Sequence, residues 1–170
     1  MFFEHAALRS VRWNHVKTNG GKKMNFLLME PMEAGGYVKK GDTPRLSVLK
    51  CKNDDEAIYR TMQSAVDGYF DFCTSYFPGL PAYVDALCND EGLFRPDLDP
   101  VLAYEVRSAD RKQYGLLKGN ILFTAVNDDG ETIGLSEEQI SGVKKALSKL
   151  SPTFLIIREA AYPVFYSIID

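Results

Sequence analysis

The sequence predicts an α+β fold, in which a single, mainly antiparallel sheet is packed by two principal helices at about residues 54–67 and 137–150. Short segments rich in strand-forming residues alternate with turn signals along the chain. Two longer segments show helical apolar spacing with capping residues at their starts. The chain has 170 residues, of which 45% are hydrophobic, and this suffices for one core without disulfides or metal.

Residues 1–23 are expected to be a basic N-terminal extension, and no clear apolar pattern assigns them to the core. A single α+β domain is expected at 24–170. The extension has a net charge of about +4, and the chain break signalled by Asn19-Gly20-Gly21 lies near its end, while the whole chain carries −3. A basic arm of this kind can bind nucleic acid. The simpler interpretation is a solvated leader, because the cations form no dense run.

The elements of the first half follow from local patterns. Strands are expected at 24–30 and 45–51, with a loop or wide hairpin between Pro31 and Pro44. One of the residues 53–55 (Asn-Asp-Asp) caps the start of the first helix, which directs Ile58, Met62, Ala65 and Val66 to one face and ends at Gly68. Strands at 69–73 and 82–88 are expected to pair antiparallel, because only a short turn joins them.

The elements of the second half also follow from local sequence patterns. Residues 101–106 fit a short strand or a helical turn, 108–113 a charged loop, and 121–126 a buried strand before the Asn127–Gly130 turn. Ser136 and Gln139 form a capping box for the second helix, which is expected to run to about Leu150. Strand-like segments at 153–157 and 164–169 complete the sheet or add a small one.

Three phrases of this chain resemble a family described as domain of unknown function 3846. The first is Gln63–Phe72, with Gly68-Tyr69-Phe70 at the end of a helix; the second is Leu87–Gly92, with its Asn89-Asp-Glu-Gly92 turn; the third is Gly119–Gln139. The resemblance covers roughly residues 45–145. It implies a phage or mobile-element origin and no established activity. The family has a Pro-Asn pair after the acidic turn. This chain has Arg95-Pro-Asp-Leu-Asp-Pro100 at that point, and the resemblance is weaker there.

The residues offer little catalytic chemistry, and we expect no catalytic residues, no metal and no cofactor. The histidines, His5 and His15, both lie in the extension, so a hydrolytic triad is not expected. The three cysteines lack metal-ligand spacing and are expected to be buried thiols. Acidic turns such as Asp128-Asp129 can bind a hard cation, but they are better explained as solvated turns.

Six residues are candidates for binding a ligand or partner. In the strand at 69–73, Tyr69 and Asp71 share one face, which becomes an outer face if Phe70 and Phe72 point inward. The acidic turn adds Asn89 and Glu91. Arg107 and Arg111 can supply positive charge to an anionic ligand, although a solvated loop explains them equally well.

From these observations we expect a non-enzymatic phage or mobile-element protein in the cytoplasm of a host bacterium. It would counteract host defence by binding a host protein or sequestering a small signalling molecule. A homo-oligomer would suit this function, while membrane and nucleic acid are not expected partners. Two alternatives remain open: a carboxylate- or metal-dependent enzyme, and a nucleic-acid accessory protein that uses the basic extension.

Overall fold

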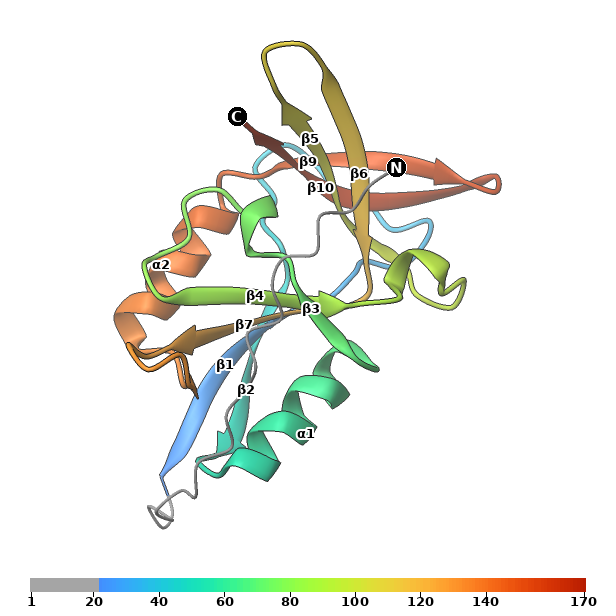
Figure 1. Cartoon of the computed structure of the whole chain (residues 1–170). Coiled ribbons are helices and arrows are strands. Elements are labelled where there is room, and N and C mark those ends of the chain that lie inside the picture. Colours follow the sequence, from blue (N-terminus) through green and yellow to red (C-terminus); the bar gives the residue numbers. More distant parts are fainter. Residues whose placement is uncertain (1–21) are drawn as a thin grey trace.

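The computed structural model describes residues 22–170, so almost all of the expected basic extension, including both histidines, lies outside the described part. Its strands and helices follow one another along the chain in this order (Figure 1): β1 (Lys23–Met29), β2 (Leu46–Lys52), α1 (Asp55–Val66), β3 (Phe70–Phe72), β4 (Val84–Asn89), β5 (Pro100–Arg107), β6 (Lys112–Lys118), β7 (Ile121–Val126), β8 (Thr132–Ile133), α2 (Glu137–Leu147), β9 (Ser151–Ile157) and β10 (Ala160–Ile169). Two short 3₁₀ helices, η1 (Thr74–Tyr76) and η2 (Gly92–Phe94), follow β3 and β4.

The strands form two sheets, so the α+β class is confirmed but the prediction of a single sheet packed by two helices is wrong. The first sheet has the order β2-β1-β7-β4-β3 and is antiparallel, with β8 beside β7. The second has the order β6-β5-β10-β9, in which β5 and β10 run parallel. The prediction missed β6, because a solvated edge strand with Lys112, Gln113 and Tyr114 all exposed shows no apolar alternation.

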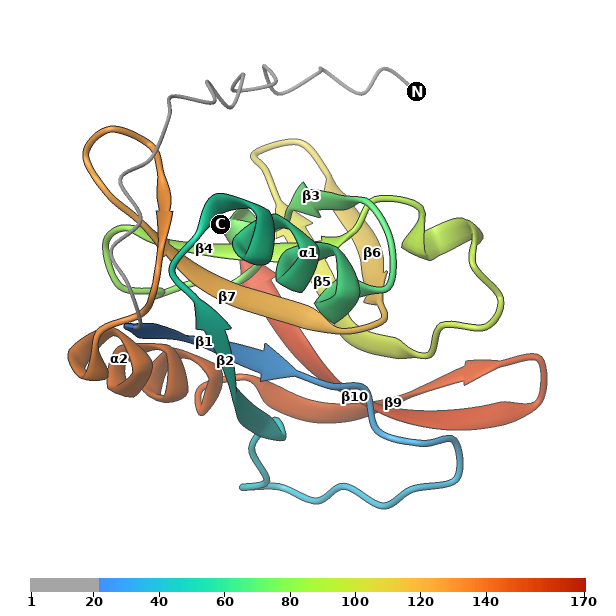
Figure 2. The ribbon, with the colours of Figure 1, turned by 90° about the horizontal axis from the view of Figure 1, so that it is seen from below.

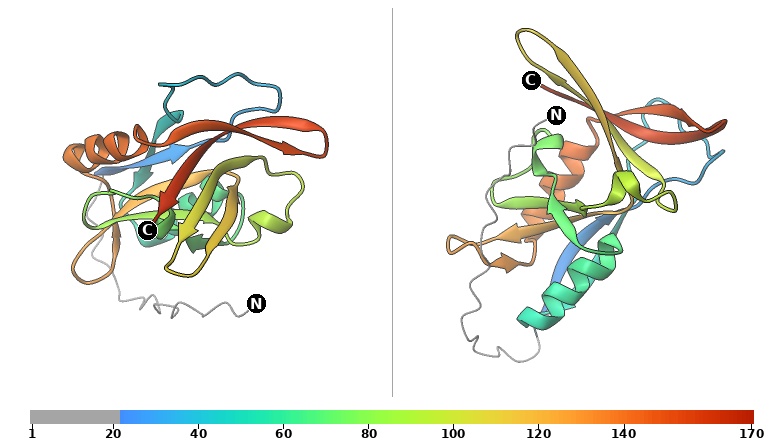
Figure 3. Two further views of the ribbon diagram at one scale, coloured as in Figure 1. Left: turned by 90° about the horizontal axis from the view of Figure 1, so that it is seen from above. Right: turned by 45° about the vertical axis from the view of Figure 1, so that its right-hand side comes forward.

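The first sheet is the middle layer of the molecule, because both of its faces are covered (Figures 2 and 3). Alternate residues of its strands point to opposite faces. Phe26 packs in one cluster with α1, while Leu27 packs in the other with α2 and the second sheet. The buried residues of α1 are those of the predicted face, Ile58, Met62, Ala65 and Val66, and α2 buries Val143, Ala146 and Leu147.

The caps of both helices agree with the sequence. The Asp54 carboxylate accepts a hydrogen bond from the Ala57 amide at 2.9 Å, which satisfies one free donor at the start of α1. Ser136 and Gln139 form the predicted capping box of α2. This helix ends at Leu147 instead of Leu150. The three cysteines are buried free thiols, and no helix within residues 22–170 is long and apolar enough to cross a membrane.

The second sheet is joined to the first through η1. The Ser167 hydroxyl donates to the Tyr76 carbonyl at 2.8 Å, and the Tyr76 and Tyr104 rings stack with centroids 4.1 Å apart. Tyr104 lies directly over Gly115 of β6, where an added Cβ would come within 2.3 Å of the tyrosine ring. The absence of a side chain at Gly115 therefore allows Tyr104 to reach η1.

We expect Gly115→Ala to lower the free energy of unfolding by about 2 kcal/mol, because the methyl group displaces the Tyr104 ring from its stack. Urea denaturation followed by circular dichroism would measure the change. Gln113→Ala, at an exposed position of the same strand, is the matched control and should change stability by less than about 0.5 kcal/mol. Equal effects of the two substitutions would contradict this explanation of Gly115.

Candidate functional site

The three phrases singled out in the sequence meet at the C-terminal end of α1. A helix end leaves backbone carbonyls without helical partners, and burying them requires donors from elsewhere. Asn89, the last residue of β4, donates through Nδ2 to the carbonyls of Val66 at 3.0 Å and Asp67 at 2.9 Å. Asn120, just before β7, donates to the Ala65 carbonyl at 2.9 Å. Side chains from two strands thus hold the helix end.

The backbone is shaped to bring Asn89 close to the helix. Asp67 adopts the left-handed conformation, with φ at 60°, and caps the helix through its own amide. At Gly68 an added Cβ would lie 2.9 Å from Asn89 Nδ2, so only glycine permits this contact. Asn89 Oδ1 also accepts the Glu91 amide at 2.9 Å, which folds the acidic turn back onto the strand.

Arg95 extends this anchor toward the solvent. Its guanidinium donates to the Asp67 carbonyl at 3.1 Å and pairs with the Asp67 carboxylate at 2.8 Å. It also binds Asp97 with two bonds of 2.6 and 2.8 Å. The hydrogen bonds from Arg95 lower the pKa of the Asp97 carboxyl to about 2. Arg95, which lies where the resemblance is weakest, therefore contacts the same helix end.

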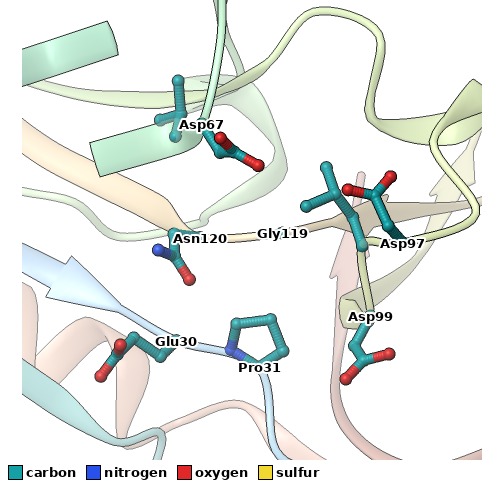
Figure 4. Close-up of a pocket in the computed structure, with 9 residues that line it drawn as sticks. Glu30, Pro31, Asp67, Asp97, Asp99, Gly119 and Asn120 are labelled. Carbon is teal, nitrogen blue, oxygen red and sulfur yellow. The ribbon is translucent and has the colours of Figure 1, made fainter. Parts of the chain in front are cut away.

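A pocket of about 320 Å³ opens beside this anchor (Figure 4). It lies between the ends of β1 and α1, the loop before β5 and the turn before β7. Val66, Leu98 and Pro31 supply apolar walls. Four carboxylates stand at separate points around it, and Asn120 lies among them: Glu30, Asp67, Asp97 and Asp99.

The pocket is electronegative even after its internal pairing. Arg95 neutralises part of the charge of Asp67 and Asp97. Within residues 22–170, Glu30 and Asp99 form no ion pair. No group of three or more His, Cys, Asp or Glu side chains in that range could hold a metal ion. Carboxylates placed around a rim in this way suit an extended cationic group, such as a guanidinium or ammonium on a flexible chain.

The structure separates the six predicted site residues into two groups. Tyr69, Asp71, Asn89 and Glu91 lie together where β3 pairs with β4, close to the helix anchor. Tyr69 and Glu91 are exposed, whereas Asn89 is buried and occupied with the helix end. Phe70 packs on α1, but Phe72 is 57% exposed, because the helix does not extend over it.

Arg107 and Arg111 belong to the second sheet and its β5–β6 hairpin, not to this pocket. Arg107 pairs at 2.9 Å with Glu105, a carboxylate on the outer face of the sheet that is only 5% exposed. Lys112 at 3.4 Å and the Tyr166 hydroxyl at 2.5 Å bind the same carboxylate. The Arg107 and Tyr166 hydrogen bonds lower the pKa of Glu105 to about 2. Arg111 is exposed in the hairpin.

None of the six predicted site residues lines the pocket. Glu30, Asp97 and Asp99 occur singly in segments expected to be loops or strand ends. Each of the three phrases contains a residue at which a strand or helix ends or begins, and these residues lie at one edge of the sheet. The order of the phrases was therefore the feature of the sequence that pointed to this region. Asn120, within the third phrase, was the residue that this signal could have identified.

Comparison with known proteins agrees with the resemblance. A family model described as "Domain of unknown function (DUF3846)" matches residues 24–148, which include β1 to α2 and every residue that lines the pocket. No curated protein and no solved structure matches the chain.

We expect Asn89→Ala to lower the free energy of unfolding by about 2–3 kcal/mol, because the Val66 carbonyl loses its side-chain donor, the Asp67 carbonyl keeps only its bond from Arg95, and the Glu91 amide loses its acceptor. Asn89→Asp should cost at least as much, since a carboxylate cannot donate to those carbonyls. Asn53→Ala, at an exposed asparagine, is the control and should change stability little. Denaturant unfolding would measure all three, and a neutral Asn89→Asp would contradict the assigned role.

The low pKa of Glu105 predicts a pH dependence of stability. A carboxyl whose pKa is lowered on folding stabilises the protein fully above its ordinary pKa, and this contribution is lost as pH falls from about 4.5 toward 2. The stability difference between the wild type and Glu105→Gln should therefore be largest near neutral pH and shrink over that range. Glu33→Gln, at an exposed position, should show no such trend. A difference independent of pH would contradict the assignment.

Proposed function

The chain belongs to the DUF3846 family, and from this premise we propose that it is a non-enzymatic mobile-element protein that counteracts host defence by binding a host protein. The pocket at the end of α1 receives a basic side chain of that partner. The observation that carries the proposal is the set of four carboxylates around one small pocket, two of them without an ion pair among the described residues.

The size and charge of the pocket favour a side chain over a whole signalling nucleotide. A volume of about 320 Å³ is at the lower end of the range for small-molecule sites. A nucleotide would bring phosphates close to Glu30, Asp97 and Asp99, and like charges in a partly desolvated site repel one another. A small molecule that binds here would instead be an organic cation such as a polyamine.

The roles of the anchoring residues support recognition over catalysis. Asn89, Asn120 and Arg95 are engaged in hydrogen bonds that fix the end of α1 and the loop before β5. Side chains held in this way keep a pocket rigid. A rigid pocket reduces the entropy that a partner loses when it binds.

The charge of the pocket can be tested directly. We expect an arginine-containing decapeptide to shift the amide resonances of Gly119 and Asn120 in an NMR titration. Its affinity should fall about tenfold in the Glu30→Gln/Asp99→Asn double variant, because two charge pairs of about 0.5–1 kcal/mol each are lost. A glutamate-containing decapeptide should not shift these resonances.

The matched control is Asp128→Asn/Asp129→Asn, which removes the same charge from the exposed turn after β7. This variant should bind the arginine peptide like the wild type. A host protein captured from lysate should be retained by the wild type and the control, lost from the pocket variant, and unaltered in intact mass. Equal losses in both double variants would contradict the proposal, as would a chemically modified partner.

A further inference from the structure

The outer edge of β9 is an unprotected sheet edge. This strand pairs with β10 on one side, and on the other side no strand or loop within residues 22–170 bonds to its backbone. The β9–β10 hairpin extends away from the body of the molecule (Figure 2). Phe154 is 45% exposed and Ile156 80% exposed, and both lie on one face of the strand. An edge of this kind offers unpaired backbone groups beside apolar side chains.

The other strands at the ends of the two sheets are blunted. Edge strands are commonly protected by lysine or by short length. β2 presents Lys50 and Lys52, and β6 presents Lys112 and Lys118. β3 has only three residues. β9, in contrast, has seven residues and no charge, and its one proline, Pro152, lies near the start of the strand, so the edge from Thr153 to Ile157 lacks the usual protection.

We propose that β9 pairs with β9 of a second copy of this chain, antiparallel about a two-fold axis at Leu155. In this register Phe154 lies opposite Ile156 of the partner subunit, and the symmetry repeats the contact. Each exposed apolar side chain is then covered by the other. A two-fold axis at Gly115 of β6 would instead place Lys112 of one copy opposite Lys118 of the partner subunit, and like charges opposite one another destabilise a strand pair.

The pairing would also complete a groove. The outer face of the second sheet holds a groove of about 390 Å³, with Ala103 and Tyr166 on its floor. Leu116 of β6 stands on one side, and Thr153 and Leu155 of β9 on the other. Because Leu155 lies on the two-fold axis, the grooves of both copies meet there and form one continuous surface. This inference does not depend on the acidic pocket or on its proposed ligand.

Sedimentation equilibrium of the full chain at 5–100 µM (roughly the range that detects micromolar dimers) tests the proposal. We expect the wild type to reach twice the chain mass. Ile156→Lys should weaken the dimer at least tenfold, because the two-fold axis brings an uncovered charge against Phe154 of the partner subunit. Val48→Lys is the matched control: Val48 is 49% exposed on β2, and its replacement should leave the dimer intact.

A second variant makes the register testable. Leu155→Cys places two thiols opposite each other on the axis, so mild oxidation should link two chains covalently. Cysteine at position 48 should not link them, and the native cysteines are buried. Circular dichroism of each variant checks that the fold is retained. A wild type that stays monomeric over the whole range would overturn the proposal, as would a dimer insensitive to Ile156→Lys or a position-155 cysteine that does not cross-link.

Discussion

The hydrogen bonds that hold the C-terminal end of α1 organise the region around the pocket. Asn89 ends β4 and Asn120 directly precedes β7, two strands that are separated in the sequence but pair in the middle sheet. Both side chains donate to carbonyls of the same helical turn. Buried carbonyls without donors would cost about 1–3 kcal/mol each. The helix can therefore end here only if β4 and β7 are paired in the right register, and correct pairing of the sheet also positions the helix.

The middle position of the first sheet explains why this anchor can shape a pocket. The sheet is covered by α1 on one face and by α2 and the second sheet on the other, so its strand ends are held from both sides. The loops that leave these ends, at Glu30, Leu98 and Gly119, start from fixed points. A pocket between such loops keeps its shape, in the same way that binding loops are positioned by a rigid scaffold in other folds.

Local chemistry made much of the fold predictable. The caps at Asp54 and Ser136, the apolar face of α1 and the antiparallel β3–β4 pair depend on residues close in sequence, and all were predicted. The placement of β5 and β6 in the second sheet was not predictable, because it depends on β5 pairing in parallel with β10, some sixty residues away. The pocket was missed for a similar reason. Its four carboxylates come from three separate segments, and only the tertiary fold brings them to one rim.

The distribution of charge also explains why Arg107 and Arg111 do not form an anion site with the predicted outer residues. Arg107 and Lys112 both bind the buried Glu105, so much of their charge is used within the sheet. An incoming phosphate would have to compete with a carboxylate that also holds the Tyr166 hydroxyl. A buried ion pair of this kind is costly to break, because one partner is left desolvated. Arg107 and Lys112 are thus better explained as partners of Glu105, while Glu30 and Asp99 beside the pocket form no ion pair within residues 22–170.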